Sequence, residues 1–370
     1  MAVYKIFPTK DATIYSRYPS LNTGLDEIIE ATTTALGVTG SNANPQTSRF
    51  LVKFSSNEMN NIINNKISGA DWDVYFKAYH AKITGLNLSS SLELHPISGS
   101  WGMGTGRYKD FPKVTNGVNW GWRQYSGSEA WQDTGFPTNV TASYSGSNLG
   151  GGNWYFISGS SQSFSYSDPL DITMNVTNAV TAWYNGTIIN DGFIIKQSDS
   201  DEFVQSVERE ATFRFFSIDT NTIYPPQLEF RWDDYNWNTG SSTNTIISTS
   251  DLVITSPNNS GTFYSESIQR FKINVRPKYP TREFQTSSIY TTNYYLPTSS
   301  CYAIKDHYTN EYVIDFDSTY TKISADDESN YFDIYMNGLE PERYYTILVK
   351  TIVNNTTLVL DEKIYFKVIN

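Results

Sequence analysis

The sequence predicts an all-β protein made of two successive domains. Its 370 residues are enough for two domains of ordinary size that each bury a core. Aromatic residues make up 15% of the chain and charged residues only 18%, which is typical of sheets with large apolar inner faces. Short apolar or alternating runs separated by turn residues recur along most of the chain. The polar stretch 235–245 is the best linker, so we expect domains at 1–238 and 251–370, joined by residues 239–250.

Bulk properties argue against several classes of protein. The net charge of −11 and the absence of a basic run disfavour binding to nucleic acid through phosphate contacts. The single cysteine, Cys301, leaves no intrachain disulfide. The N-terminal residues MAVYKIFPTKDATIY lack the apolar run of a signal peptide, and no run is long enough to span a membrane. We therefore expect a protein that folds in a reducing cytoplasm and has no membrane partner.

The first part of the N-terminal domain is expected to consist of strands and one short helix. We expect strands at 3–15, 28–31, 50–54, 75–83 and 86–96. Pro19 to Gly24 should form a turn. Ser56 is expected to cap a helix that buries Met59, Ile62 and Ile63 on one face.

The stretch from Asp171 to Asp234 carries the most regular patterns. Val176, Ala179, Val180 and Trp183 are spaced as on one face of a helix, which Gly186 can end. Residues 192–196 form an apolar run suited to a buried strand. Leu228, Phe230 and Trp232 then alternate with polar residues, which predicts a half-buried closing strand.

These motifs resemble the DNRLRE family of jelly-roll-like modules, in the form found in structural proteins of tailed bacteriophages. At the start of the chain the matching residues are Asp11 to Tyr15, Pro19, Leu21, Asn22 and Gly24. Further on they are Asp171, Thr173, Val176, Trp183, Gly186, Asn190, Gly192, Phe193, Ile195, Phe216, Ser217, Tyr224, Pro226, Leu228 and Phe230. Val176 lies one residue later than in the family pattern. The resemblance covers about two-thirds of the chain and implies a jelly-roll β-sandwich for residues 1–234.

Residues 99–165 are rich in Gly and Ser and carry tryptophans at 101, 120, 122, 131 and 154. One interpretation is a docking surface made of rigid aromatic side chains on loops. The other is that these rings cover the sandwich as part of its core. We favour the core for Trp101 and Trp131. For Trp120, Trp122 and Trp154, with the neighbouring Tyr125 and Tyr155, contact with other subunits or with glycans stays open.

The acidic run Asp199-Ser-Asp201-Glu202 has two interpretations. Clustered carboxylates suit calcium, but the spacing matches no calcium-loop pattern, so we favour a solvated hairpin turn. Gly102-Met-Gly104-Thr-Gly106 is expected to be a flexible turn, because no helix follows that could complete a phosphate site. No metal or other cofactor is expected.

Catalytic motifs are missing from the sequence. The three histidines, at 80, 95 and 307, are scattered, and no nucleophile elbow or Walker-type loop is present. Asp110, Glu129 and Asp133 are the candidates for a glycosidase pair, but nothing in the sequence positions them. We therefore expect no catalytic residues.

The C-terminal part reads as an immunoglobulin-like β-sandwich of seven short strands. The expected strands are 252–255, 271–275, 301–304, 312–316, 331–335, 344–353 and 363–368. Leu339, Pro341 and Tyr345 resemble the entry to a penultimate strand in fibronectin-type sandwiches, where the tyrosine hydroxyl bonds back to the backbone of the corner. Asn354-Asn355 is expected to form the last hairpin turn.

Together these features lead to two functional hypotheses. The first is a non-enzymatic structural protein of a tailed-phage virion, in the neck, collar, tail or fibre-docking region. It would contact other virion proteins and copies of itself, in a ring-like homo-oligomer. The alternative is a carbohydrate-binding module that adheres to host-surface glycans.

Overall fold

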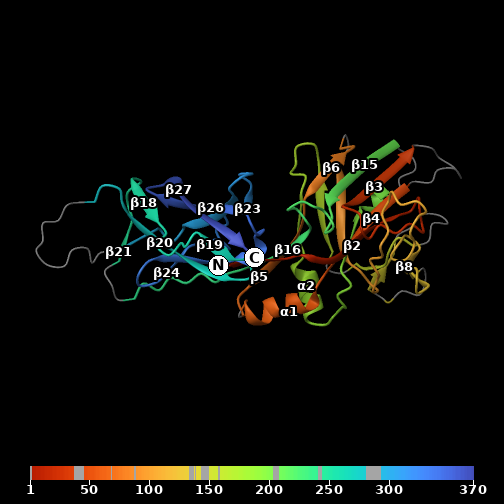
Figure 1. The fold of residues 1–370 in the computed structure, drawn as a ribbon, viewed down its shortest axis with the longest axis horizontal. Coiled ribbons are helices and arrows are strands. Elements are labelled where there is room, and N and C mark those ends of the chain that lie inside the picture. The colour runs from red at the N-terminus through yellow and green to blue at the C-terminus, as the bar shows by residue number, and fades with distance from the viewer. Residues whose placement is uncertain are drawn as a thin grey trace, which may run out of the picture. The chain divides into compact units, whose positions relative to one another are not determined.

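The computed structural model describes residues 2–36, 46–67, 69–86, 89–132, 137, 139–142, 150–156, 159–202, 208–240, 244–280 and 293–370. The protein is mostly β, with 47% strand and 8% helix, and contains several antiparallel sheets and two curled half-barrels (Figure 1). The expected all-β class is therefore confirmed.

The chain divides into two compact units. The N-terminal unit comprises Ile6–Ser68 and Asp73–Glu229, and the C-terminal unit comprises Met1–Lys5, Gly69–Trp72 and Phe230–Asn370. The division at Phe230 falls inside β16 (Gln227–Trp232), upstream of residues 239–250. That stretch contains β17 (Asn244–Ile246), which pairs with β21 (Asn293–Tyr295).

One large antiparallel sheet dominates the N-terminal unit. Its strands, in order, are β12 (Ser160–Phe164), β7 (Ser90–Pro96), β14 (Phe193–Gln197), β4 (Gln46–Phe54), β3 (Ile28–Leu36), β15 (Glu208–Phe216) and β6 (His80–Thr84), and β2 (Pro8–Tyr15) also pairs with β4. All five residues of β14 are buried, as the apolar run predicted. Phe50, Phe193 and Phe213 have no exposed surface and belong to the core of this unit.

Two expected strands are each divided in the structure. Residues 3–15 form β1 (Ala2–Ile6) and β2, and residues 75–83 form β5 (Trp72–Ala78) and β6. The second division occurs because the chain changes sheets at Tyr79: β5 pairs with β13 (Ile172–Asn175), whereas β6 pairs with β15. A period-two pattern continues through such a change, so the sequence does not mark it.

The two longer helices were both predicted, and they lie side by side (Figure 1). Helix α2 (Thr177–Tyr184) buries Ala179, Val180 and Trp183, and it is followed by Gly186 at φ +70°. Helix α1 (Ser56–Asn65) buries Met59, Ile62 and Ile63. Its cap is Ser55 rather than the expected Ser56, because Ser55 is extended and its side chain accepts from the Glu58 N–H.

The C-terminal unit contains two sheets that enclose an aromatic core. One sheet has the order β19 (Thr262–Tyr264), β27 (Thr356–Ile369), β26 (Tyr344–Val353), β22 (Cys301–Asp306) and β23 (Tyr312–Ile314). The other contains β17, β21, β20 (Ile268–Pro277), β25 (Asn330–Tyr335) and β24 (Ser324–Ala325), with β18 (Leu252–Thr255) paired to β20. The Phe332 ring stacks on Tyr302 at 4.1 Å and on Phe271 at 5.8 Å. All seven expected strands are present, and the short β17, β19, β21 and β24 were missed.

The corner motif of the C-terminal unit behaves as expected. The Tyr345 hydroxyl donates a hydrogen bond to the Glu340 carbonyl at 3.0 Å, and Leu339 is buried next to the short 3₁₀ helix η1 (Met336–Gly338). Asn354 and Asn355 both have positive φ and connect β26 to β27. In the described part of the chain, no helix combines the length and apolar character needed to cross a membrane.

Candidate functional site

Most of the tryptophans in the Gly-rich segment are buried. Trp101, Trp120, Trp131 and Trp154 belong to one apolar cluster with residues of β2, β4 and β14. This confirms the core interpretation for Trp101 and Trp131. Trp120 is also fully buried and Trp154 is only 3% exposed, so neither ring is open to an external ligand in this structure.

The other three candidates lie nearer the surface. Trp122 and Tyr155 are half-buried, and Tyr125 is 41% exposed. Trp122 and Tyr125 are in edge-to-face contact, with ring centroids 5.8 Å apart. Of the five residues predicted to contact subunits or glycans, only these three have side chains that an external partner can reach.

Glycines allow the backbone to approach these rings closely. Gly150, Gly151 and Gly152 all have positive φ. A Cβ atom at Gly151 would lie 2.7 Å from the Trp120 ring and 2.9 Å from the Arg49 guanidinium. Glycine at these positions therefore lets the backbone of residues 150–152 pack directly against the Trp120 ring and Arg49.

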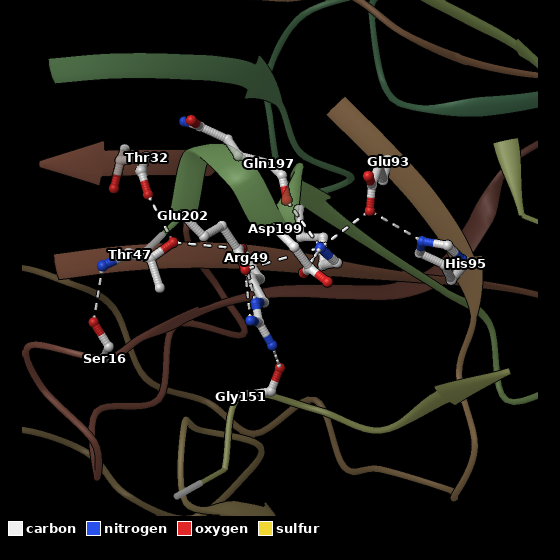
Figure 2. Close-up of polar contacts among 11 residues, drawn as sticks. Ser16, Thr32, Thr47, Arg49, Glu93, His95, Gly151, Gln197, Asp199 and Glu202 are labelled. Atoms are coloured by element: carbon white, nitrogen blue, oxygen red, sulfur yellow. Dashed lines mark hydrogen bonds and ion pairs between the residues drawn. The ribbon is translucent and has the colours of Figure 1, made fainter. Parts of the chain in front are cut away.

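A buried ion pair between Arg49 and Glu202 lies close to two of these tryptophans. Figure 2 shows the pair and its polar neighbours. Arg49 of β4 donates to both carboxylate oxygens of Glu202, from Nε at 2.9 Å and from Nη2 at 2.6 Å, and neither side chain is exposed. Glu202 belongs to the short helix α3 (Asp199–Glu202). The guanidinium also lies 5.0 Å from the Trp120 ring and 5.2 Å from the Trp154 ring, and it donates to the Gly151 carbonyl. One cation therefore joins the sheet, α3 and the Gly-rich segment.

Lys196 of β14 extends this network. Its ammonium contacts Asp199 at 2.7 Å, Glu93 at 3.1 Å and Glu202 at 3.9 Å, although the side chain is only 1% exposed. It also lies 5.4 Å from the Trp154 ring, on which His95 stacks. The hydrogen bond from His95, helped by the Lys196 charge, holds the pKa of Glu93 below its usual value. We call Arg49, Glu93, Lys196, Asp199 and Glu202 the buried ionic network. Its centre is Arg49, Lys196 and Glu202, whereas the side chains of Glu93 and Asp199 are 30% and 67% exposed.

The prediction of a solvated hairpin turn at Asp199 to Glu202 is wrong for the second half of this run: Asp199 and Ser200 are exposed, whereas the next two residues of α3 are buried. Asp201 is 8% exposed, Glu202 is fully buried, and Asp201 accepts from the Ser91 N–H. Glu202 is buried because it pairs with Arg49 and Lys196, and a buried cation is stable only beside a carboxylate. Among the described residues, no group of three or more His, Cys, Asp or Glu side chains could hold a metal ion.

The Gly102 to Gly106 turn closes around the buried side chain of Asn22. The Asn22 amide donates to the carbonyls of Met103 at 2.7 Å and Val118 at 2.8 Å, and its Oδ1 accepts from the Gly106 N–H at 2.8 Å. Gly104 has a φ of +79°, and a Cβ there would lie 2.3 Å from Asn22 Oδ1. The expected flexible turn is instead built around one amide.

Several of the signature residues make structural contacts. Asp171 accepts from the backbone N–H of His80 and lies 2.7 Å from the His80 ring. Gly192, at φ +95°, lies so close to β4 that a Cβ would be 2.4 Å from the Val52 carbonyl. Phe193 packs on Trp183 with ring centroids 4.5 Å apart. Among the signature residues near the end of the N-terminal unit, Phe216 stacks on Tyr224, and Pro226 and Leu228 are buried.

The candidates for a glycosidase pair are not brought together by any contact in the described structure. Glu129 pairs with Arg123 at 3.0 Å on the surface. Asp110 accepts from the Arg107 N–H. Asp133 lies outside the described residues.

Asp11, at the start of the chain, meets the end of β15. Its carboxylate accepts from the Ser217 hydroxyl at 3.0 Å and from the Ile218 N–H at 2.8 Å, and the residue is 1% exposed. Burial raises the pKa of Asp11 to about 7, against the lowering effect of these two hydrogen bonds. The folded protein therefore holds the Asp11 proton more tightly than the unfolded chain does.

The raised pKa of Asp11 makes the free energy of unfolding depend on pH. Because the pKa of Asp11 is raised on folding, its stabilising contribution is complete below the unfolded value near 3.8 and is lost as the pH rises through about 7. At roughly 1.4 kcal/mol per pKa unit, we expect wild type to lose about 2 to 3 kcal/mol relative to Asp11→Asn between about pH 5 and about pH 8. Denaturant unfolding of both proteins at each pH measures this. The difference between them cancels the contributions of Asp26 and Glu58, whose pKa values are also raised and which do not contribute to the shift of Asp11. A constant difference across this range would contradict the assignment.

Comparisons with known proteins give no further assignment. No protein-family model matches the chain, and no curated protein matches it significantly. The resemblance to phage jelly-roll modules stays a prediction.

Proposed function

We propose that the protein is a non-enzymatic structural component of a tailed-bacteriophage virion, located in the neck, collar, tail or fibre-docking region. In this proposal the N-terminal unit is a jelly-roll sandwich and the C-terminal unit an immunoglobulin-like sandwich. Their partners are other virion proteins and further copies of the chain. The resemblance of residues 1–234 and the mostly β fold support this proposal.

The buried ionic network is the observation that carries the non-enzymatic part of the proposal. A catalytic acid, base or nucleophile must reach a substrate, whereas Arg49 and Glu202 have no exposed surface and Lys196 has almost none. Their charges are satisfied by one another and by the rings of Trp120 and Trp154. This use of charge fixes loops on a sheet, which is what a rigid building block needs.

An exposed aromatic patch on the C-terminal unit supports assembly through a sandwich face. His307 lies 4.8 Å from the Tyr365 ring and 5.6 Å from the Tyr308 ring, and Tyr308 lies 6.3 Å from Tyr344. Tyr308 is 66% exposed, Tyr344 42% and Tyr365 37%. Tyrosine is enriched at protein interfaces because a large, stiff ring with a polar end gains contact area at low entropic cost. We call these four residues the tyrosine patch.

The tyrosine patch gives a direct test of self-assembly. We expect the wild-type chain to sediment as an oligomer. The double variant Tyr308→Ala/Tyr344→Ala should raise the dissociation constant of that oligomer at least tenfold, because both rings are removed from the proposed interface. Analytical ultracentrifugation over a concentration series measures this. Tyr279→Ala is the matched control, since Tyr279 is 76% exposed and lies outside the patch.

The melting temperature of each variant separates assembly from folding. All three proteins should unfold alike at concentrations where the wild type is monomeric. If the double variant assembles as the wild type does, the patch is not the interface. If the wild type is monomeric throughout, the homo-oligomeric part of the proposal fails.

A further inference from the structure

The N-terminal unit contains an open cavity that the buried ionic network does not reach. Its volume is about 670 Å³, within the range of small-molecule sites. It lies where the chain enters β3, against segment 107–110 and β15. Its lining includes Asp26, Glu30, Arg107, Tyr108, Asp110 and Arg214.

The polar groups of this cavity are held in place by the protein. Both carboxylate oxygens of Asp26 accept from the Tyr108 N–H at 3.1 Å, and Asp110 accepts from the Arg107 N–H at 2.7 Å. Glu30 accepts from Arg214 Nε at 2.7 Å. Burial raises the pKa of Asp26 to about 6, so at neutral pH this group is mostly ionised and accepts hydrogen bonds. The cavity thus offers fixed donors and acceptors at short intervals.

The charges that line the cavity nearly balance. Four carboxylates (Asp26, Glu27, Glu30 and Asp110) face three cations (Arg107, Lys109 and Arg214). A strongly charged ligand of either sign would meet like charges as well as opposite ones. A neutral ligand with many hydroxyl groups can instead donate to carboxylates and accept from guanidinium groups at the same time.

Two tyrosines, Tyr15 and Tyr108, also line the cavity, and Tyr108 is the more exposed of them. Tyr108 is 39% exposed, and its ring is positioned by Tyr15 at 5.2 Å, Tyr18 at 6.0 Å and the Lys113 ammonium at 5.1 Å. A preset ring beside convergent polar groups suits the C–H face of a pyranose, whose hydroxyl groups point outward from the ring edge.

We propose that this cavity binds a neutral saccharide of one or two pyranose units, with Tyr108 as the stacking surface and Asp26 as a hydrogen-bonding partner. This inference goes beyond the structural role and does not depend on it. It also places sugar binding away from Trp120, Trp122 and Trp154.

The test uses the full-length chain and a panel of neutral sugars. Saturation-transfer NMR with glucose, galactose, N-acetylglucosamine, lactose and maltose should show saturable binding of at least one of them. Tyr108→Ala and Asp26→Asn should each weaken that binding about tenfold or more. Tyr125→Ala should bind as the wild type does, since Tyr125 is about as exposed as Tyr108 but does not line the cavity.

The inference would be overturned if no sugar of the panel binds, if binding survives both cavity variants, or if Tyr125→Ala abolishes it. Preferential binding of arginine amide or glucuronate over every neutral sugar would also overturn it, because the site would then recognise charge. Circular dichroism of each variant confirms that it is folded. Ultracentrifugation of the same samples reports on assembly separately, so failure of one proposal is distinguishable from failure of the other.

Discussion

Arg49→Met is expected to lower the free energy of unfolding of the N-terminal unit by about 3 to 5 kcal/mol, because it leaves Glu202 charged and buried without its bidentate partner. The Gly151 carbonyl also loses its donor, and the rings of Trp120 and Trp154 lose the cation between them. Urea unfolding followed by tryptophan fluorescence measures the change, since most tryptophans lie in this unit.

The paired variant Arg49→Met/Glu202→Leu is the control for this prediction. Removing both charges removes the unpaired carboxylate, and apolar replacements of similar volume are often neutral. We expect the double variant to recover most of the loss. If it is no more stable than Arg49→Met, the loss comes from packing against the tryptophans and not from the buried charge.

Asn22→Ala is expected to cost about 2 to 4 kcal/mol. The substitution removes the donor to the carbonyls of Met103 and Val118 and the acceptor of the Gly106 N–H, and the contacts with Val118 and Gly106 are buried. The same urea experiment measures the loss. Limited proteolysis should also show faster cleavage near Gly102 to Gly106, because Asn22 is the group around which this turn closes.

Asn116→Ala is the matched control on the same segment. The Asn116 side chain makes two hydrogen bonds, accepting from the Thr105 N–H and donating to the Thr105 hydroxyl, but it is exposed. Water can replace those bonds, so we expect a loss below about 1 kcal/mol. Equal losses in the two variants would contradict the role given to the buried amide.

Local patterns predicted most of the individual elements. The spacing of Ala179, Val180 and Trp183 predicted α2, and the apolar run predicted the buried β14. The corner at Tyr345 and the turn at Asn354 were also predicted, since their determinants lie within a few residues of one another. Such features depend on local backbone chemistry, which a single sequence carries.

The buried ionic network could not be predicted in the same way. Arg49 and Glu202 are 153 positions apart, and no local pattern pairs them. A partial signal was present: Arg49 directly precedes the apolar run 50–52 and Lys196 directly follows the apolar run 193–195, and a cation buried there requires a carboxylate partner. That signal indicates that a partner exists and does not identify which acidic run supplies it.

Composition also failed to separate buried rings from those nearer the surface. Trp120 and Trp122 are two positions apart in the same Gly-rich context, yet Trp120 is fully buried and Trp122 is only half-buried. The cavity beside Tyr108 was missed for a related reason, because its walls come from three distant parts of the chain. Long-range packing decides both features.

Single-particle electron microscopy of the purified full-length chain tests the central claim most directly. A structural virion component of this kind predicts closed, symmetric rings in which the tyrosine patch lies between neighbouring subunits. Monomers at every concentration, together with cleavage of a glycan by the same sample, would contradict it.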